Sequence, residues 1–113
     1  MQVVFESRDD EGTHMRELSI DRVRFALRRL SALVARAKVQ FSDVNGPRGG
    51  VDKRCQVEVH TDSVGTVVIA SLARDWRTAL DRSLARVTRA LRRSLQRNLK
   101  PARKRAAKIA LTS

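Results

Sequence analysis

Apolar and polar residues follow two different periods in the first part of the chain. Residues 2–7 place apolar side chains at alternate positions, which predicts a short strand. Residues 8–13 are polar and acidic and predict a loop. Between residues 20 and 34 the apolar positions recur every three or four residues, which predicts an amphipathic helix. A different face of this helix would carry Arg22, Arg29 and Arg36.

From residue 38 onward the apolar period becomes two, which predicts three more strands. They are expected over residues 38–44, 55–60 and 66–73. A loop rich in Gly and Pro, residues 45–54, interrupts the pattern after the first of them. A short turn at residues 62–65 predicts a hairpin between the other two.

The last predicted element is a long amphipathic helix. Asp75 is a suitable N-cap residue, and Pro101 is expected to end or kink the helix. The apolar stripe consists of Trp76, Leu80, Leu84, Val87, Leu91 and Leu95. Trp76 is expected to anchor the core, with stacking on a base as the alternative. We therefore expect a folded domain over residues 1–97 and a basic tail over residues 98–113.

The expected element order is β-α-β-β-β-α, which indicates an α+β fold. Its two helices should pack on one face of a four-stranded sheet and leave the other face more exposed. The 113 residues suffice for one domain, and their apolar content of 42% argues against general disorder. Because only 4% of the residues are aromatic, the core should be mostly aliphatic.

The chain carries a formal net charge of +12, with 24 Lys and Arg against 12 Asp and Glu. So large an excess indicates a polyanionic partner, with nucleic acid first and an anionic membrane surface second. No apolar run approaches the roughly 18 residues of a membrane span. The N-terminus lacks the features of a secretion signal. We therefore expect a cytoplasmic protein.

The basic face of the last helix is the strongest candidate contact for that partner. It carries Arg82, Arg86, Arg89, Arg93, Arg97 and Lys100, which would form a ridge about 27 Å long at about 1.5 Å per residue. Asp75 and Asp81 are the acidic residues of this helix, so few of the cations have an i,i+4 partner. A solvated face that aids solubility is the alternative, although mixed charges would serve that purpose with less repulsion. Arginine binds phosphate in a bidentate manner and stacks on bases, which suits folded RNA.

The loop of residues 45–54 is the second candidate contact. Its adjacent glycines, Gly49 and Gly50, permit close backbone approach to a large partner. Its cations are Arg48, Lys53 and Arg54. The loop is not a P-loop, because no Gly-Lys-Ser/Thr follows at the required spacing, and an ordinary turn with solvated charges is an equally good interpretation. Asp43 and Asp52, which flank the glycines, are assigned to turn geometry.

Candidate catalytic groups are few. Cys55, the single cysteine, follows two cations that could lower its pKa, but it alternates with Val57 and Val59 and is expected to be buried. His14 and His60 have no Cys or carboxylate at a metal-ligand spacing. We predict no enzymatic activity, no cofactor, no metal and no small-molecule substrate.

Residues 39–55, VQFSDVNGPRGGVDKRC, resemble a segment of the ribosome hibernation-promoting factor family, also called ribosome-associated inhibitor A or sigma-54 modulation proteins. The element order and the Arg-rich last helix are similar too, so the resemblance extends over residues 1–97. It implies a bacterial translation inhibitor that binds 16S rRNA of the small (30S) subunit, also within the 70S ribosome. The implied site lies between head and body, near the decoding channel for mRNA and tRNA.

The resemblance can be carried over to individual arginines. The matching positions are Arg82, Arg86, Arg89 and Arg93, with a weaker match at Arg22 and Arg29. Roles for the cations of the 45–54 loop depend on their charge and not on the resemblance. Longer family members carry a second domain that pairs two ribosomes, and we expect this protein to be a short form without it. The 45–54 loop is also longer than in the commonest short members. The resemblance therefore leaves open whether the protein promotes or opposes ribosome pairing.

Three other functions are compatible with parts of the pattern. A general binder of structured RNA or double-stranded nucleic acid would need the same charge. An enzyme would have to use Cys55 or the glycine loop. Transcriptional modulation, which one family name suggests, would need a base-reading element that the sequence does not show.

Overall fold

Four strands form a single sheet whose spatial order, β1-β2-β3-β4, follows their order in the sequence. The strands are β1 (Gln2–Ser7), β2 (Val34–Asp43), β3 (Lys53–Thr61) and β4 (Gly65–Ala73). β1 pairs with β2 in parallel, whereas β2 with β3 and β3 with β4 are antiparallel. The computed structural model describes residues 1–44 and 51–112, with the backbone alone described for residues 98–112.

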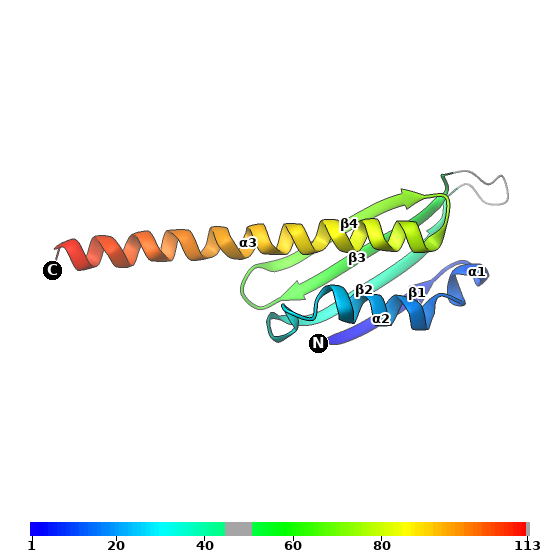
Figure 1. Ribbon diagram of the computed structural model, residues 1–113, viewed down its shortest axis with the longest axis horizontal. Helices are drawn as coiled ribbons and strands as arrows, with labels where there is room; N and C mark the ends of the chain where they lie inside the picture. Colours follow the sequence, from blue (N-terminus) through cyan, green and yellow to red (C-terminus); the bar gives the residue numbers. More distant parts are fainter. Residues whose placement is uncertain (45–50, 113) are drawn as a thin grey trace.

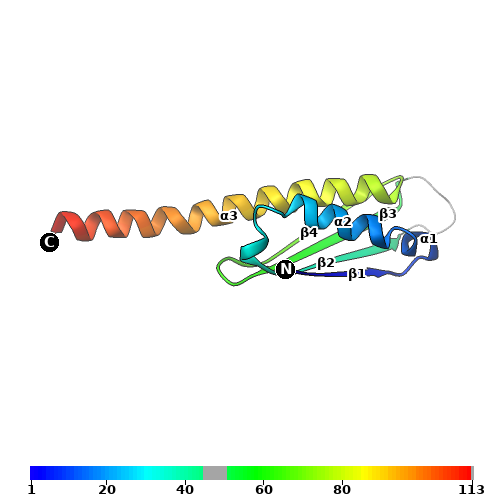
Figure 2. The same ribbon diagram turned by 60° about the horizontal axis from the view of Figure 1, so that its bottom comes forward.

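The helices lie on one side of this sheet. They are α1 (Asp10–Thr13), α2 (Arg16–Ala26), the 3-10 helix η1 (Ser31–Leu33) and α3 (Trp76–Thr112). Figure 2 shows α2 and α3 next to each other on the same face. α2 belongs to the crossover between β1 and β2, because parallel neighbours cannot be joined by a tight turn. The observed order confirms the predicted α+β fold. None of the described helices is long and apolar enough to cross a membrane.

The helices and the sheet bury a mostly aliphatic core. Its members include Val23 of α2 and Leu27 directly after it, Val39 and Phe41 of β2, Val57 and Val59 of β3, and Trp76, Leu80, Leu84, Val87 and Leu91 of α3. The Phe41 ring stacks on the Trp76 ring with centroids 4.8 Å apart and meets Phe5 edge to face at 5.2 Å. Since Trp76 is buried in this three-ring cluster, its predicted role as a core anchor is confirmed.

The opposite face of the sheet is not covered by any of the described elements. The register places polar side chains there, with Gln40 opposite Gln56 and Lys38 opposite Glu58. These residues are half-buried, whereas the residues that alternate with them are buried. The alternation read from the sequence therefore assigned the two faces correctly.

The first long helix ends earlier than the sequence predicted. α2 ends at Ala26, and the backbone is already extended at Val34, where β2 begins. Arg29 lies in the connection after α2 and Arg36 lies in β2, so neither shares a helix face with Arg22. Tertiary pairing explains why Arg36 is not helical, because the parallel ladder with β1 holds the chain extended from Arg36 onward.

The predicted loop at residues 8–13 contains the short helix α1. The Asp9 carboxylate accepts hydrogen bonds from the backbone N–H groups of Glu11 at 2.9 Å and Gly12 at 3.3 Å. This is N-capping of a helix too short to show an apolar period. The signal that could have revealed it is the acidic N-cap followed by two acidic residues.

α3 continues through Pro101 to Thr112, so of the two outcomes predicted for that proline, an end or a kink, the end of the helix is wrong. Proline lacks a backbone N–H and leaves the carbonyl of residue 97 without its helical donor. This part of α3 projects beyond the sheet (Figure 1). Water can therefore reach that carbonyl and replace the missing donor.

Phe41→Ala should lower the free energy of unfolding by about 3–5 kcal/mol, because it removes a fully buried ring and leaves a cavity. Urea denaturation followed by circular dichroism measures the change. Leu33→Ala is the control, since Leu33 is exposed, and it should change the free energy by about 0.5 kcal/mol or less. Equal effects of the two substitutions would contradict the role assigned to the three-ring cluster.

Candidate nucleic-acid interface

α3 presents a row of five exposed arginines along one side of the helix, apart from its buried residues. This arginine row consists of Arg82, Arg86, Arg89, Arg93 and Arg97. Spacings of three and four residues keep the five on one side of the helix. The sixth predicted member, Lys100, belongs to the residues whose side chains are not described. The predicted basic face is thus present as a surface, and its binding role stays a prediction.

The rotation of α3 is determined at its start and along its apolar side. Asp75 caps the helix, since its carboxylate accepts hydrogen bonds from the Thr78 N–H at 2.8 Å and the Thr78 hydroxyl at 2.9 Å. The hydrogen bond from the Thr78 N–H is the main cause that lowers the pKa of Asp75, and the one from the Thr78 hydroxyl adds to it. The predicted N-cap is confirmed. Because Leu80 and Leu84 are buried in the core, the arginine row lies on the exposed side of α3, next to the edge of the sheet at β4.

Two members of the arginine row bind the edge strand of the sheet. Arg82 donates to the Leu72 carbonyl at 3.1 Å, and Arg86 donates to the Ala70 carbonyl at 2.8 Å and the Ser71 hydroxyl at 3.0 Å. Because a guanidinium has five N–H donors, both side chains keep donors for a phosphate. The contacts also place positive charge along the edge of β4, which disfavours pairing with a further strand.

The rest of the arginine row is not neutralised by acidic groups. Arg89, Arg93 and Arg97 form no hydrogen bond or ion pair with any residue whose side chain is described. Asp75, directly before α3, is engaged in the helix cap. Asp81 of α3 pairs with Arg22 at 3.1 Å. A polyanion could therefore bind these three arginines without first displacing an ion pair.

The predicted residues of α2 are only partly brought to this surface. Arg22 reaches α3, since its guanidinium is hydrogen-bonded to Asp81. Arg29 is exposed after the end of α2, and no contact links it to the arginine row. The two residues predicted together are therefore separated in the structure, and Arg22 is the one beside α3.

Among the loop cations, Arg54 is placed beside the arginine row. It lines a shallow pocket together with Arg82 and Arg86 of α3 and Leu72 of β4. Its guanidinium also donates to the Gln56 amide oxygen at 2.9 Å. Arg54 therefore extends the basic surface from α3 across the edge strand. Arg48 lies outside the described residues.

Lys53 does not belong to the exposed basic surface. Its ammonium lies 2.6 Å from the Asp43 carboxylate, 3.7 Å from that of Asp52 and 5.4 Å from the centre of the Trp76 ring. The side chain is only 15% exposed, and the hydrogen bond to Asp43 is the main cause that raises the pKa of Lys53. These contacts use the charge of Lys53 within the fold, and its predicted contact with phosphate stays a prediction. The two aspartates assigned to turn geometry also hold this lysine.

The structure gives Cys55 no reactive environment. The side chain is fully buried, and burial raises the pKa of its thiol to about 12. The burial predicted from alternation with Val57 and Val59 is confirmed. Within the described residues, no three His, Cys, Asp or Glu side chains form a group that could hold a metal ion.

Sequence reasoning overlooked Arg92, Arg28 and Phe25. All three are exposed. Arg92 follows Arg89 by three residues, a spacing that could have indicated a wider basic face. Phe25 occupies a helix position whose exposure cannot be judged without knowing which side of α2 meets α3.

Native Cys55 should not react with iodoacetamide at slightly alkaline pH, because little thiolate forms and the sulfur is buried. Mass spectrometry of the protein with and without denaturing urea measures the alkylation. The unfolded chain is the internal control and should react completely. Rapid alkylation of the folded protein would contradict the buried placement.

The free energy of unfolding should decline as the pH rises above 9.0, since the unfolded thiol loses its proton there and the folded thiol does not.

Lys53→Met should destabilise the protein, because it removes the cation that neutralises Asp43 and the fully buried Asp52. The urea midpoint measures this effect. Arg54→Met is a matched control, since it removes the same charge but breaks only the hydrogen bond to Gln56. If both substitutions left the midpoint unchanged, the inward role of Lys53 would be refuted.

The fold is similar to that of two proteins of known structure. The first, a ribosomal subunit interface protein from Coxiella burnetii, gives a TM-score of 0.64 at 15% identity and covers 82% of this chain and 96% of its own. The second, the N-terminal domain of protein Y from Thermus thermophilus, gives a TM-score of 0.57 at 24% identity and covers 82% and 98%. The sequence matches no protein-family model and no curated protein. At these identities the likeness establishes the fold, so this chain has the fold of a ribosomal subunit interface protein and of a protein Y N-terminal domain.

Proposed function

We propose that this protein is a translation inhibitor of the ribosome hibernation-promoting factor family. It binds the 30S subunit, alone or within the 70S ribosome, through 16S rRNA near the decoding channel. Its mechanism is exclusion, because a folded domain in that channel occupies the space of mRNA and tRNA. No catalytic step is needed. The site of action is the cytoplasm, where the ribosomes are.

The observation that carries this proposal is the arginine row of α3. Its five members span about 22 Å along the helix at about 1.5 Å per residue. Arg89, Arg93 and Arg97 have no acidic partner among the described residues, and Arg82 and Arg86 are ordered by β4. Arginine gives bidentate contacts to phosphate. A long row of this kind, without acidic partners among the described residues, suits the backbone of folded RNA.

The fold supports the ribosome as the source of that RNA. One protein with the same fold is described as a ribosomal subunit interface protein. The resemblance of residues 39–55 to the hibernation-promoting factor family points to the same class. In this proposal residues 1–97 form the ribosome-binding domain, and the basic residues 98–113 add a second contact.

A general binder of structured RNA is the alternative, because the unneutralised arginine row would attract any RNA. The two functions differ in selectivity. A ribosome factor should sediment with 30S subunits in the presence of an equal mass of duplex RNA, whereas a general binder should be removed by that competitor. If the protein divides equally between 30S subunits and duplex RNA at physiological salt, the result favours the general RNA binder.

Replacing Arg89, Arg93 and Arg97 by Gln should weaken binding to 30S subunits by about 100-fold or more, with each lost charged contact contributing on the order of 1 kcal/mol. Affinity measured by sedimentation at several salt concentrations tests this. The slope of log K against log salt should become shallower by about two to three, since each phosphate contact releases about one counterion.

The matched control is the triple variant Arg8, Arg16 and Arg24 to Gln. These residues are exposed and lie outside the arginine row, and the variant loses the same net charge. It should bind 30S subunits with nearly the affinity of the original protein. If both triple variants lose affinity equally, the positive charge as a whole binds RNA and the assignment to α3 fails.

A further inference from the structure

One aromatic side chain of this protein is exposed. Phe25, near the end of α2, is 67% exposed, whereas Phe5, Phe41 and Trp76 pack on one another. A single exposed apolar residue is common on protein surfaces. Its surroundings therefore decide whether Phe25 has a function.

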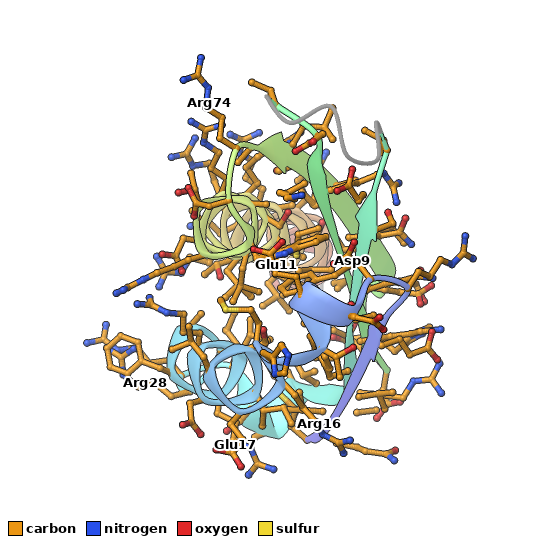
Figure 3. The ribbon with its side chains drawn as sticks, turned by 90° about the vertical axis from the view of Figure 1, so that its right-hand side faces the viewer. Asp9, Glu11, Arg16, Glu17, Arg28 and Arg74 are labelled. Atoms are coloured by element: carbon orange, nitrogen blue, oxygen red, sulfur yellow. The ribbon has the colours of Figure 1, made fainter. Side chains whose placement is uncertain are left out.

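Phe25 lines a groove between α2 and α3. The apolar part of the lining includes Ala26 of α2 with Leu84 and Ala85 of α3. The polar part includes Arg89, Arg92 and Arg93 of α3. Figure 3, which looks along α3, shows the two helices next to each other on one side of the sheet. The groove thus combines an aromatic side chain, an apolar lining and a basic wall.

The charge of the groove is strongly positive. Arg22 and Asp81 also line it, but they pair with each other at 3.1 Å. The three arginines of its α3 wall form no ion pair with any residue whose side chain is described. Every cation of the lining is an arginine and none is a lysine. Arginine is the cation that both binds phosphate in a bidentate manner and stacks on aromatic rings and bases.

Arg28 holds Phe25 in its exposed position. The guanidinium carbon lies 4.1 Å from the centre of the Phe25 ring, and the same guanidinium donates to the Phe25 carbonyl at 2.7 Å. Figure 3 shows Arg28 on the outer side of α2, away from the sheet. The ring is thus ordered by a cation stacked on one of its faces. A pre-ordered ring loses little conformational freedom when a planar ligand stacks on it.

We propose that this groove binds one unpaired nucleotide of RNA, whose base stacks on Phe25. The phosphates on either side of that nucleotide bind Arg89, Arg92 and Arg93. Stacking on an aromatic ring accepts any base, because every base has a π-face. This inference depends on the proposed function and adds a feature of the RNA to it. That feature is a bulged or single-stranded nucleotide next to the RNA helix that binds the arginine row.

An RNA ligand fits this groove better than an acidic peptide does. Carboxylates of a peptide would pair with the arginines but would leave the Phe25 ring without a planar partner. An unpaired nucleotide supplies both a planar ring and negative charge within one unit. The groove therefore matches a nucleotide in both of its chemical properties.

The test compares two RNA hairpins that differ by one bulged nucleotide. Fluorescence anisotropy at physiological salt gives their affinities for the full-length protein. The original protein should bind the bulged hairpin roughly fivefold to tenfold more tightly, the low end of the effect of base–aromatic stacking. Phe25→Ala should bind both hairpins equally, with the affinity for the plain hairpin unchanged.

A base analogue reports the stacking itself. With 2-aminopurine at the bulge, binding of the original protein should quench its fluorescence, and Phe25→Ala should quench it much less. Phe25→Trp should restore both the quenching and the preference for the bulge. Leu33→Ala, which removes another exposed apolar side chain outside the groove, should behave as the original protein does.

The outcomes separate this inference from the proposed function. If the original protein binds both hairpins equally but still binds 30S subunits, the nucleotide site is refuted and the ribosome proposal stands. If Phe25→Ala keeps the preference for the bulge, the site lies elsewhere and the inference is overturned. Loss of all binding to 30S subunits and to both hairpins at physiological salt would overturn both.

Discussion

The packing of α3 against the sheet is the constraint on which the rest of this surface depends. Ala79 and Ser83 are fully buried, and their small size lets the helix approach the sheet closely. The Ser83 hydroxyl donates to the Cys55 carbonyl of β3 at 2.8 Å, and Trp76 stacks on Phe41 at 4.8 Å. These contacts determine which side of α3 faces solvent. They also close Cys55 off from reagents.

Pairing with acidic groups separates structural cations from available ones. Lys53 lies between Asp43 and the buried Asp52, so its charge is used within the fold. Arg22 pairs with Asp81 at the surface, where an ion pair contributes about 1 kcal/mol or less and chiefly orients the two side chains. The arginines of α3 lack such partners among the described residues. The arginine row therefore forms a continuous line of available positive charge along one helix.

The two flanks of the arginine row offer different chemistry. On one flank Arg82 and Arg86 bind the edge of β4, which orders them for contact with a rigid phosphate backbone. On the other flank a groove toward α2 joins arginines to the exposed ring of Phe25. A folded RNA with paired regions and an unpaired nucleotide would find a complementary contact on each side. Shape and charge together, and not charge alone, would then supply selectivity.

The sequence by itself determined the features that depend on local period. The alternation after residue 38, the apolar stripe of α3, the Asp75 cap and the burial of Cys55 all follow from which face of one element is apolar. Only the tertiary structure decided where the chain becomes extended after α2, because β2 pairs with β3 from Val34 and with β1 from Arg36. The inward position of Lys53 and the groove beside Phe25 also depend on elements far apart in the chain. Such contacts between distant segments leave no periodic signal in the sequence, since a period reports which face of an element is buried but not what lies against it.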